Sequence, residues 1–152
     1  MMSKPSVVQL VGAIRENLSG AIAPAVANPG AQKLLLMIDH LLQTIGVRAE
    51  HEIDWMVTYA DDVANLAERM VAADTAPASV TETLHRYHKQ RSTSLATSAV
   101  TANYALAGDV LSAILEATIS DEGDVGVSAR GLLARDVAYG VDIVGEFELI
   151  PP

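Results

Sequence analysis

The chain has 152 residues, half of them apolar and 4% aromatic, and it carries ten Lys and Arg against nineteen Asp and Glu. This apolar fraction excludes a disordered chain, and the net charge of −9 disfavours unspecific binding to nucleic acid or to an anionic membrane. The absence of cysteine excludes disulfides, thiolate metal sites and a cysteine nucleophile.

The first predicted helix spans about residues 6–23. Ser6 and Gln9 have the spacing of a capping box at its start, and Pro24 ends it. Arg15 interrupts the apolar stretch before any cleavage site, so the segment is interpreted as part of a mature cytoplasmic protein. Its apolar residues recur every three or four positions and form one stripe: Val7, Val11, Ile14, Leu18 and Ile22.

The second predicted helix, about 30–45, is apolar on almost every side. A helix of this kind must be covered all round, which predicts a place at the centre of a bundle or in a subunit interface. Gly46 is predicted to cap it, and a third helix over about 48–73 is expected to fold back on it. This hairpin would place His40 near Asp54, as a polar bridge or, alternatively, as an imidazole oriented for general base catalysis.

The fourth predicted helix, about 79–119, opens on the capping-box spacing of Ser79 and Glu82, with a bend expected near residues 92–94 or at Gly108. A fifth helix follows over about 128–144, and residues 145–152 form an extended arm. Long helices with short connections predict an all-α antiparallel bundle of four to five helices, in a single domain over residues 1–152. No stretch reaches the length and apolarity of a membrane span.

The strongest local feature is a basic segment, residues 82–91, in an otherwise acidic chain. If the helices on either side of Pro77 pack antiparallel, this segment faces an acidic one and forms a ladder of ion pairs. The expected pairs are Arg86 with Glu68, Lys89 with Asp62 and Arg91 with Asp61.

Two other interpretations of the basic segment stay open. It could bind a small anionic or acyl ligand such as phosphate, a nucleotide or coenzyme A, although no glycine-rich phosphate loop accompanies it. The residues for this are His85, Arg86, His88, Lys89 and Arg91. It could also hold a metal, because Glu-x-x-His spacing places both side chains on one helix face. The ligands would then be Glu82, His85, His88 and Glu68.

The first 50 residues resemble a family of short helical bacterial proteins of unknown function. The resemblance rests on the Pro5-Ser6-x-x-x-Leu10 start, the Ala23-Pro24-Ala25 turn and the leucines Leu34 and Leu42. The family's Arg-Val-Ala-Ala-Asn type of stretch is replaced here by residues 35–39, so no functional residue is transferred. Because the family accompanies genes for phosphotransferase-like kinases and acyl-CoA dehydrogenases, the resemblance implies an accessory role beside that chemistry.

These observations favour a non-catalytic accessory protein that self-associates, as a dimer, or docks on a partner enzyme. The apolar second helix predicts a buried interface, and the function requires neither a cofactor nor a catalytic residue. A ligand-binding protein or enzyme using the basic segment, and a metal-dependent bundle enzyme, are the alternatives. Neither nucleic acid nor a membrane is an expected partner.

Overall fold

The structure, a computed structural model, describes residues 4–119 and 123–144. Within these residues every regular element is helical and none is a strand, which confirms the all-α prediction. The five α-helices are α1 (Val7–Asn17), α2 (Pro29–Ala72), α3 (Ala78–Gln90), α4 (Thr97–Ala117) and α5 (Asp124–Val144). The predicted arm, residues 145–152, and most of the loop before α5 lie outside the described residues.

The chain divides into two compact units. The described residues 4–52 and 142–144 belong to the first unit, and those between 53 and 141 belong to the second. The prediction that residues 1–152 form one domain stays a prediction. Because α2 contributes to both units, each unit is described by itself below.

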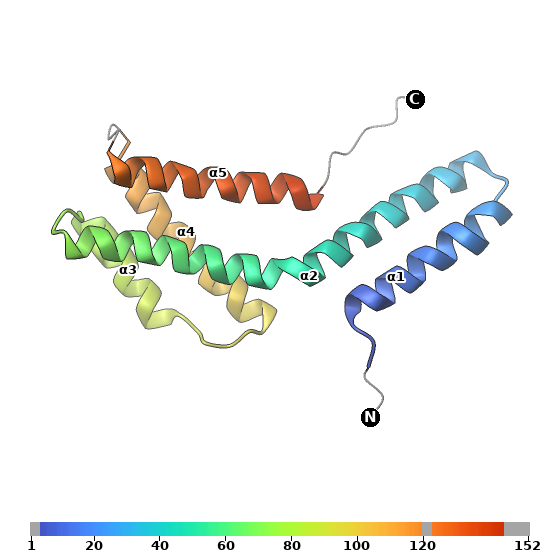
Figure 1. The fold of residues 1–152 in the computed structure, drawn as a ribbon, viewed down its shortest axis with the longest axis horizontal. Helices are drawn as coiled ribbons and strands as arrows, with labels where there is room; N and C mark the ends of the chain where they lie inside the picture. Colours follow the sequence, from blue (N-terminus) through green and yellow to red (C-terminus); the bar gives the residue numbers. More distant parts are fainter. Residues whose placement is uncertain (1–3, 120–122, 145–152) are drawn as a thin grey trace. The chain divides into compact units, whose positions relative to one another are not determined.

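The first unit contains a helical hairpin made by α1 and the first part of α2, which lie side by side (Figure 1). We call residues 4–52 the N-terminal hairpin. Its start confirms the predicted capping box, because the Gln9 amide donates to Ser6 Oγ (3.2 Å) and the Ser6 amide donates to Gln9 Oε1 (2.9 Å). The helix ends earlier than predicted. It changes at Leu18 to a π-turn and at Ala23 to a 3₁₀ turn.

Helix α2 corrects the prediction of a break at Gly46, because it runs without interruption from Pro29 to Ala72. Gly46 lies inside the helix, where a Cβ would meet Val11 of α1 at an ordinary 3.5 Å. The residues after it are good helix formers, and Arg48 pairs with Glu52 one turn on.

The predicted hairpin about Gly46 is therefore wrong, and so is the contact of His40 with Asp54. The two residues lie on one helix about four turns apart. Asp39 instead pairs with α1, where Arg15 Nε and Nη2 reach its two carboxylate oxygens at 2.7 and 3.0 Å. This bidentate pair lowers the pKa of Asp39 below its usual range, chiefly through the hydrogen bonds from Arg15.

The turn between α2 and α3 shows why the chain breaks near Pro77, as predicted. Asp74 takes a positive φ of 56° and its amide donates to the Val71 carbonyl, while the Thr75 amide donates to that of Met70. These two bonds form a Schellman motif, which ends a helix. Helix α3 then begins at Ala78 with Pro77 in the N-cap position, so the predicted cap at Ser79 is wrong.

The predicted helix over 79–119 is two helices, joined by a loop at 91–96 in the region of the expected bend. Two serines hold this loop, since the Ser94 amide donates to Ser92 Oγ and the Ala96 amide donates to Ser94 Oγ, both at 3.1 Å. Serine side chains compete in this way with helical hydrogen bonds. The break therefore has a local cause that the sequence already contains.

The core of the second unit lies where α3, α4 and α5 pack with about the last five turns of α2. The largest fully buried side chains of this unit are Tyr87, Leu66, Ile114, Val63, Val80, Val100 and Val110, all of which except Val100 belong to the core. Helix α4 is long and apolar enough to cross a membrane by length and composition alone. The expectation that no stretch reaches the length and apolarity of a membrane span is therefore wrong for α4. Its residues Val110 and Ile114 are wholly buried in this core, and 33% of the apolar stretch is buried in all.

Candidate functional site

The basic segment lies on α3, which turns one face to the core and the other to solvent. Val80, Leu84 and Tyr87 are buried at helical spacing. All the predicted ligand-binding side chains lie on the exposed remainder of the helix or just after it. His88 and Lys89 occupy the last turn, where positive charge interacts favourably with the helix dipole.

The predicted ladder of ion pairs forms only in part. Arg91 Nη2 lies 2.7 Å from Asp61 Oδ1, which is the predicted pair. Glu68 contacts His88 at 3.1 Å instead of Arg86.

The remaining predicted partners are engaged with other helices. Arg86 reaches Asp109 of α4 at 3.5 Å, and Asp62 pairs with Arg135 of α5 at 2.9 Å instead of with Lys89. The partners differ because the prediction assumed only the antiparallel pairing of the two helices on either side of Pro77. In the structure α4 and α5 also pack beside α2 and α3. In place of one ladder between two helices, separate ion pairs connect α2, α3, α4 and α5.

The four predicted metal ligands are not gathered into one site. Glu68 and His88 are in contact, but residues 4–119 and 123–144 contain no group of three or more His, Asp or Glu side chains placed to hold a metal ion. Glu82 and His85 take no part in the one contact that forms. A turn of helix aligns Glu82 with His85, yet a third ligand must come from another element, and none of the described residues supplies it.

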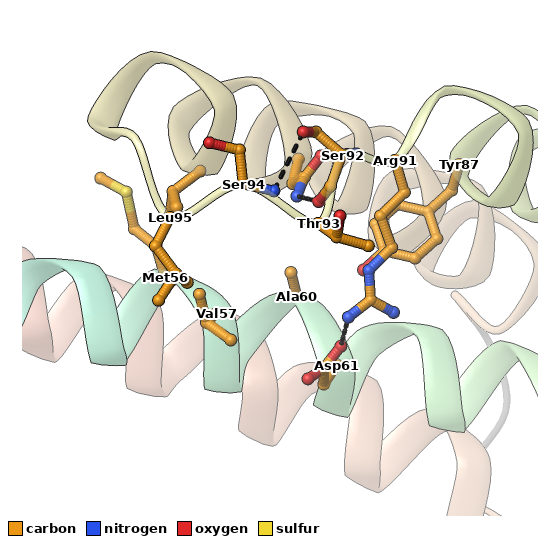
Figure 2. Close-up of a pocket in the computed structure, with 12 residues that line it drawn as sticks. Met56, Val57, Ala60, Asp61, Tyr87, Arg91, Ser92, Thr93, Ser94 and Leu95 are labelled. Atoms are coloured by element: carbon orange, nitrogen blue, oxygen red, sulfur yellow. Dashed lines mark hydrogen bonds and ion pairs between the residues drawn. The ribbon is translucent and has the colours of Figure 1, made fainter.

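A small pocket lies at the end of α3, between Arg91, the loop 91–96 and the Met56–Asp61 stretch of α2 (Figure 2). The Arg91 guanidinium lies 5.6 Å from the centre of the Tyr87 ring and bridges to Asp61. The free space is about 70 Å³, whereas pockets for drug-sized ligands measure about 300–1,000 Å³. The pocket therefore has no room for a nucleotide or coenzyme A.

Asparagine 103 of α4 fixes the loop that closes this pocket. Its Oδ1 accepts from the Ser92 amide at 2.9 Å, and its Nδ2 donates to the Ser92 carbonyl at 2.8 Å. Both backbone groups of one residue are thus satisfied by one side chain. No pattern in the sequence indicates this pairing, because the ten residues between Ser92 and Asn103 include the loop whose shape it sets.

An open groove of about 590 Å³ lies between α2 and α5. Two of its lining residues are cationic, but Arg135 already pairs with Asp62 and stands 5.6 Å over the Trp55 ring. Arg69 is the other cation, and Leu66 and Leu132 contribute apolar surface. The groove was not predicted from the sequence, because its shape depends on how α5 packs on α2.

An aromatic cluster in the second unit was also not predicted. Trp55 stacks on Tyr139 with ring centres 4.2 Å apart, and Tyr59 lies beside both Trp55 (5.7 Å) and Tyr104 (5.3 Å). The Tyr104 hydroxyl donates to the Asp136 carboxylate. Trp55 is thus a packing residue, partly buried against the core.

This cluster predicts a loss of stability at alkaline pH. Burial, assisted by the nearby charge of Asp136, raises the pKa of Tyr59 from 10.0 to about 12, and burial also raises the pKa of Tyr104 and Tyr87. A raised folded-state pKa favours the neutral phenol, so its stabilisation is complete below pH 10 and is lost as the pH rises through 12. Denaturant unfolding followed by far-UV circular dichroism should show a free energy of unfolding that falls over this window. A constant value there would contradict these assignments.

The N-terminal hairpin exposes many large apolar side chains. Val11 is its one buried side chain between residues 4 and 52, and many of its other apolar side chains are about half exposed. The exposed set includes Val7, Leu10, Ile14, Leu34, Leu36, Met37, Ile38, Leu41 and Ile45. Within the first unit taken by itself, the second predicted helix packs on α1 and leaves these apolar side chains uncovered, which supports an interface as the interpretation of its sequence. Its predicted place at the centre of a bundle stays a prediction.

Comparison of the chain with family models, with curated proteins and with solved structures finds no match. The resemblance of the first 50 residues to short helical bacterial proteins stays a prediction.

Proposed function

We propose that this protein is a non-catalytic helical interaction protein, and that its N-terminal hairpin docks on another copy of the chain or on a partner enzyme. One observation carries the proposal. Between residues 4 and 52 a single side chain, Val11, is buried, while large apolar side chains on both helices are about half exposed. Contiguous apolar surface of this kind marks interaction sites in soluble proteins.

The energetics support association. Fully burying a Leu or Ile side chain is worth about 1.5–3 kcal/mol, so covering the exposed half of one is worth about 1 kcal/mol. Covering seven half-exposed side chains of this kind would contribute a favourable free energy of about 7 kcal/mol. This is of the same order as the entropic cost of association, about 4–15 kcal/mol. Exposed apolar residues also occur in the second unit, for example Val137 of α5, but there each helix has a buried face in a common core.

The charges of the basic segment favour this function over anion binding. A cation that recognises an anionic ligand must be available to it. Arg86, His88 and Arg91 each face a carboxylate already, on Asp109, Glu68 and Asp61. The adjoining pocket of about 70 Å³ is also too small for a nucleotide or coenzyme A.

A photo-reactive amino acid at Ile38 tests the proposal in the native cells. Ile38 is 44% exposed on the hairpin, and we expect it to form a discrete covalent adduct. The same group at Gln90, exposed on α3, is the control and should form none. Adding Leu41→Lys should abolish the Ile38 adduct because a charge would then be buried in the interface. Equal labelling from Ile38 and Gln90, or an adduct that survives Leu41→Lys, would overturn the proposal.

A further inference from the structure

The exposed apolar residues of the N-terminal hairpin follow the spacing of a helix–helix seam. On α2 the residues Leu34, Ile38, Leu41 and Ile45 are separated by four, three and four positions, and on α1 Val7, Leu10 and Ile14 are separated by three and four. Alternation of three and four is the heptad pattern by which helices pack knobs into holes. All seven side chains are 44–59% exposed. We call these seven residues the apolar face.

The two stripes lie on the same side of the hairpin. Val11 and Gly46, which contact each other, mark the inward direction on each helix. Successive residues of a helix are rotated by about 100° about its axis. Counted from Val11 on α1 and from Gly46 on α2, both stripes are rotated away from the inward direction in the same rotational sense. Because the two helices run antiparallel, equal rotations bring both stripes to one side.

The opposite side of the hairpin is different in character. Arg15 and Asp39 are rotated from the inward direction in the opposite sense to the stripes. They form their bidentate ion pair on that side, and Gln43 Oε1 lies 3.4 Å from Arg15 Nη2. Leu36, 62% exposed, also falls on this side. By the same rotation Arg48 and Glu52, which pair with each other, fall on the side of the two stripes, with Glu52 seven positions after Ile45. The apolar side of α2 therefore carries no charge between Leu34 and Ile45 and ends in an ion pair.

The charge distribution separates the hairpin from the rest of the chain. Residues 4–52 contain four cations and four anions, so the hairpin is neutral, and the whole net charge of −9 falls in residues 53–152. Two hairpins can thus approach without electrostatic repulsion. The cations are Lys4, Arg15, Lys33 and Arg48, and the anions are Glu16, Asp39, Glu50 and Glu52.

We propose that two copies of this chain join their apolar faces about a two-fold axis and form an intermolecular four-helix bundle. The inference rests on the proposed function and commits it to one occupant, a second copy. The seven residues of the apolar face carry no charge and do not select a partner by electrostatic complementarity, whereas two heptad stripes side by side match the same pair on another hairpin. A two-fold interface uses one patch twice, and two antiparallel hairpins supply the four helices that such a bundle needs.

The molar mass of the purified chain tests the inference by light scattering across the micromolar range. A dimer has about 32 kDa, twice the 16.0 kDa of the chain. The double variant Ile38→Lys/Leu41→Lys should shift the mass to that of the monomer. Leu36→Lys, which removes an equally apolar and exposed side chain from the other side, is the matched control and should remain a dimer. Fluorescence of Trp55, in the second unit, shows in each variant that this unit is folded.

Chemical cross-linking gives a second readout that depends on no destabilising charge. Because the chain has no cysteine, Ile38→Cys introduces a single thiol, and a short bismaleimide should link it to its counterpart in the other copy. Leu36→Cys is the control and should give little dimer band.

The outcomes separate this inference from the proposed function. A purified chain that is monomeric throughout, and unlinked through Ile38→Cys, overturns the homodimer. If Ile38 then still labels a different protein in cells, the proposed function stands. If it labels nothing, both fall.

Discussion

Replacing Leu66 by alanine is expected to lower the free energy of unfolding by about 2–5 kcal/mol. Leu66 is 1% exposed and belongs to the core in which α2 packs with the other helices of the second unit. Truncation removes apolar burial and leaves a cavity, because close-packed neighbours relax only in part. In a core with few aromatic rings, each leucine carries a large share of the buried surface.

The measurement is guanidinium denaturation followed by Trp55 fluorescence and by far-UV circular dichroism. Leu95→Ala is the matched control, because it removes the same groups from a side chain that is 70% exposed, and it should cost less than about 0.5 kcal/mol. Similar losses for Leu66 and Leu95 would show that the core does not lie where the structure places it.

The second large effect is expected at Tyr104. Its hydroxyl donates to the Asp136 carboxylate, and a hydrogen bond to a charged group is worth about 1.5–3 kcal/mol. Tyr104→Phe should reduce the free energy of unfolding by that amount. A double-mutant cycle with Asp136→Ala should give a cost well below the sum of the two single variants, since each removes the same bond.

Tyr87→Phe supplies the comparison for this prediction. The Tyr87 hydroxyl is buried, and it has no hydrogen-bond partner among residues 4–119 and 123–144. Removing it leaves no partner unsatisfied, and the ring keeps its contact with Arg91, so the variant should be nearly as stable as the parent. A loss at Tyr87 equal to that at Tyr104 would contradict both assignments.

The division of charge links the fold to the proposed function. The neutral N-terminal hairpin carries the apolar face, while residues 53–152 carry the whole negative charge and contain most of the buried core. The negative charge of residues 53–152 disfavours unspecific contacts, whereas the neutral, apolar hairpin can pair with another surface. One chain can thus combine a stable, soluble unit with a surface for association.

Local signals in the sequence predicted local structure correctly. Helical spacing predicted an all-α fold, and the Ser6–Gln9 pair forms the predicted capping box. The break before Pro77 is also observed, with Asp74 in the left-handed conformation that ends α2. These features depend on groups within one or two turns of each other, and the sequence contains all of them.

Gly46 shows where a local signal failed. Glycine is common after the last turn of a helix, but here it lies within α2, because the residues that follow continue the helix and Val11 packs against it. The expected contact of His40 with Asp54 failed with it. Only the packing of α1 on α2 distinguishes a glycine that ends a helix from one that another helix approaches.

The sequence by itself determined the all-α fold, the capping box at Ser6, the break near Pro77, the acidic balance and the need to cover residues 34–45. The tertiary structure decided which side chains meet: Arg91 with Asp61 as predicted, but Glu68 with His88 and Asp62 with Arg135, and Trp55 with Tyr139. The physical reason is the rotation of about 100° per residue in a helix. Small shifts in packing turn a side chain toward a different neighbour, so contacts across helices depend on the whole arrangement and not on any single segment.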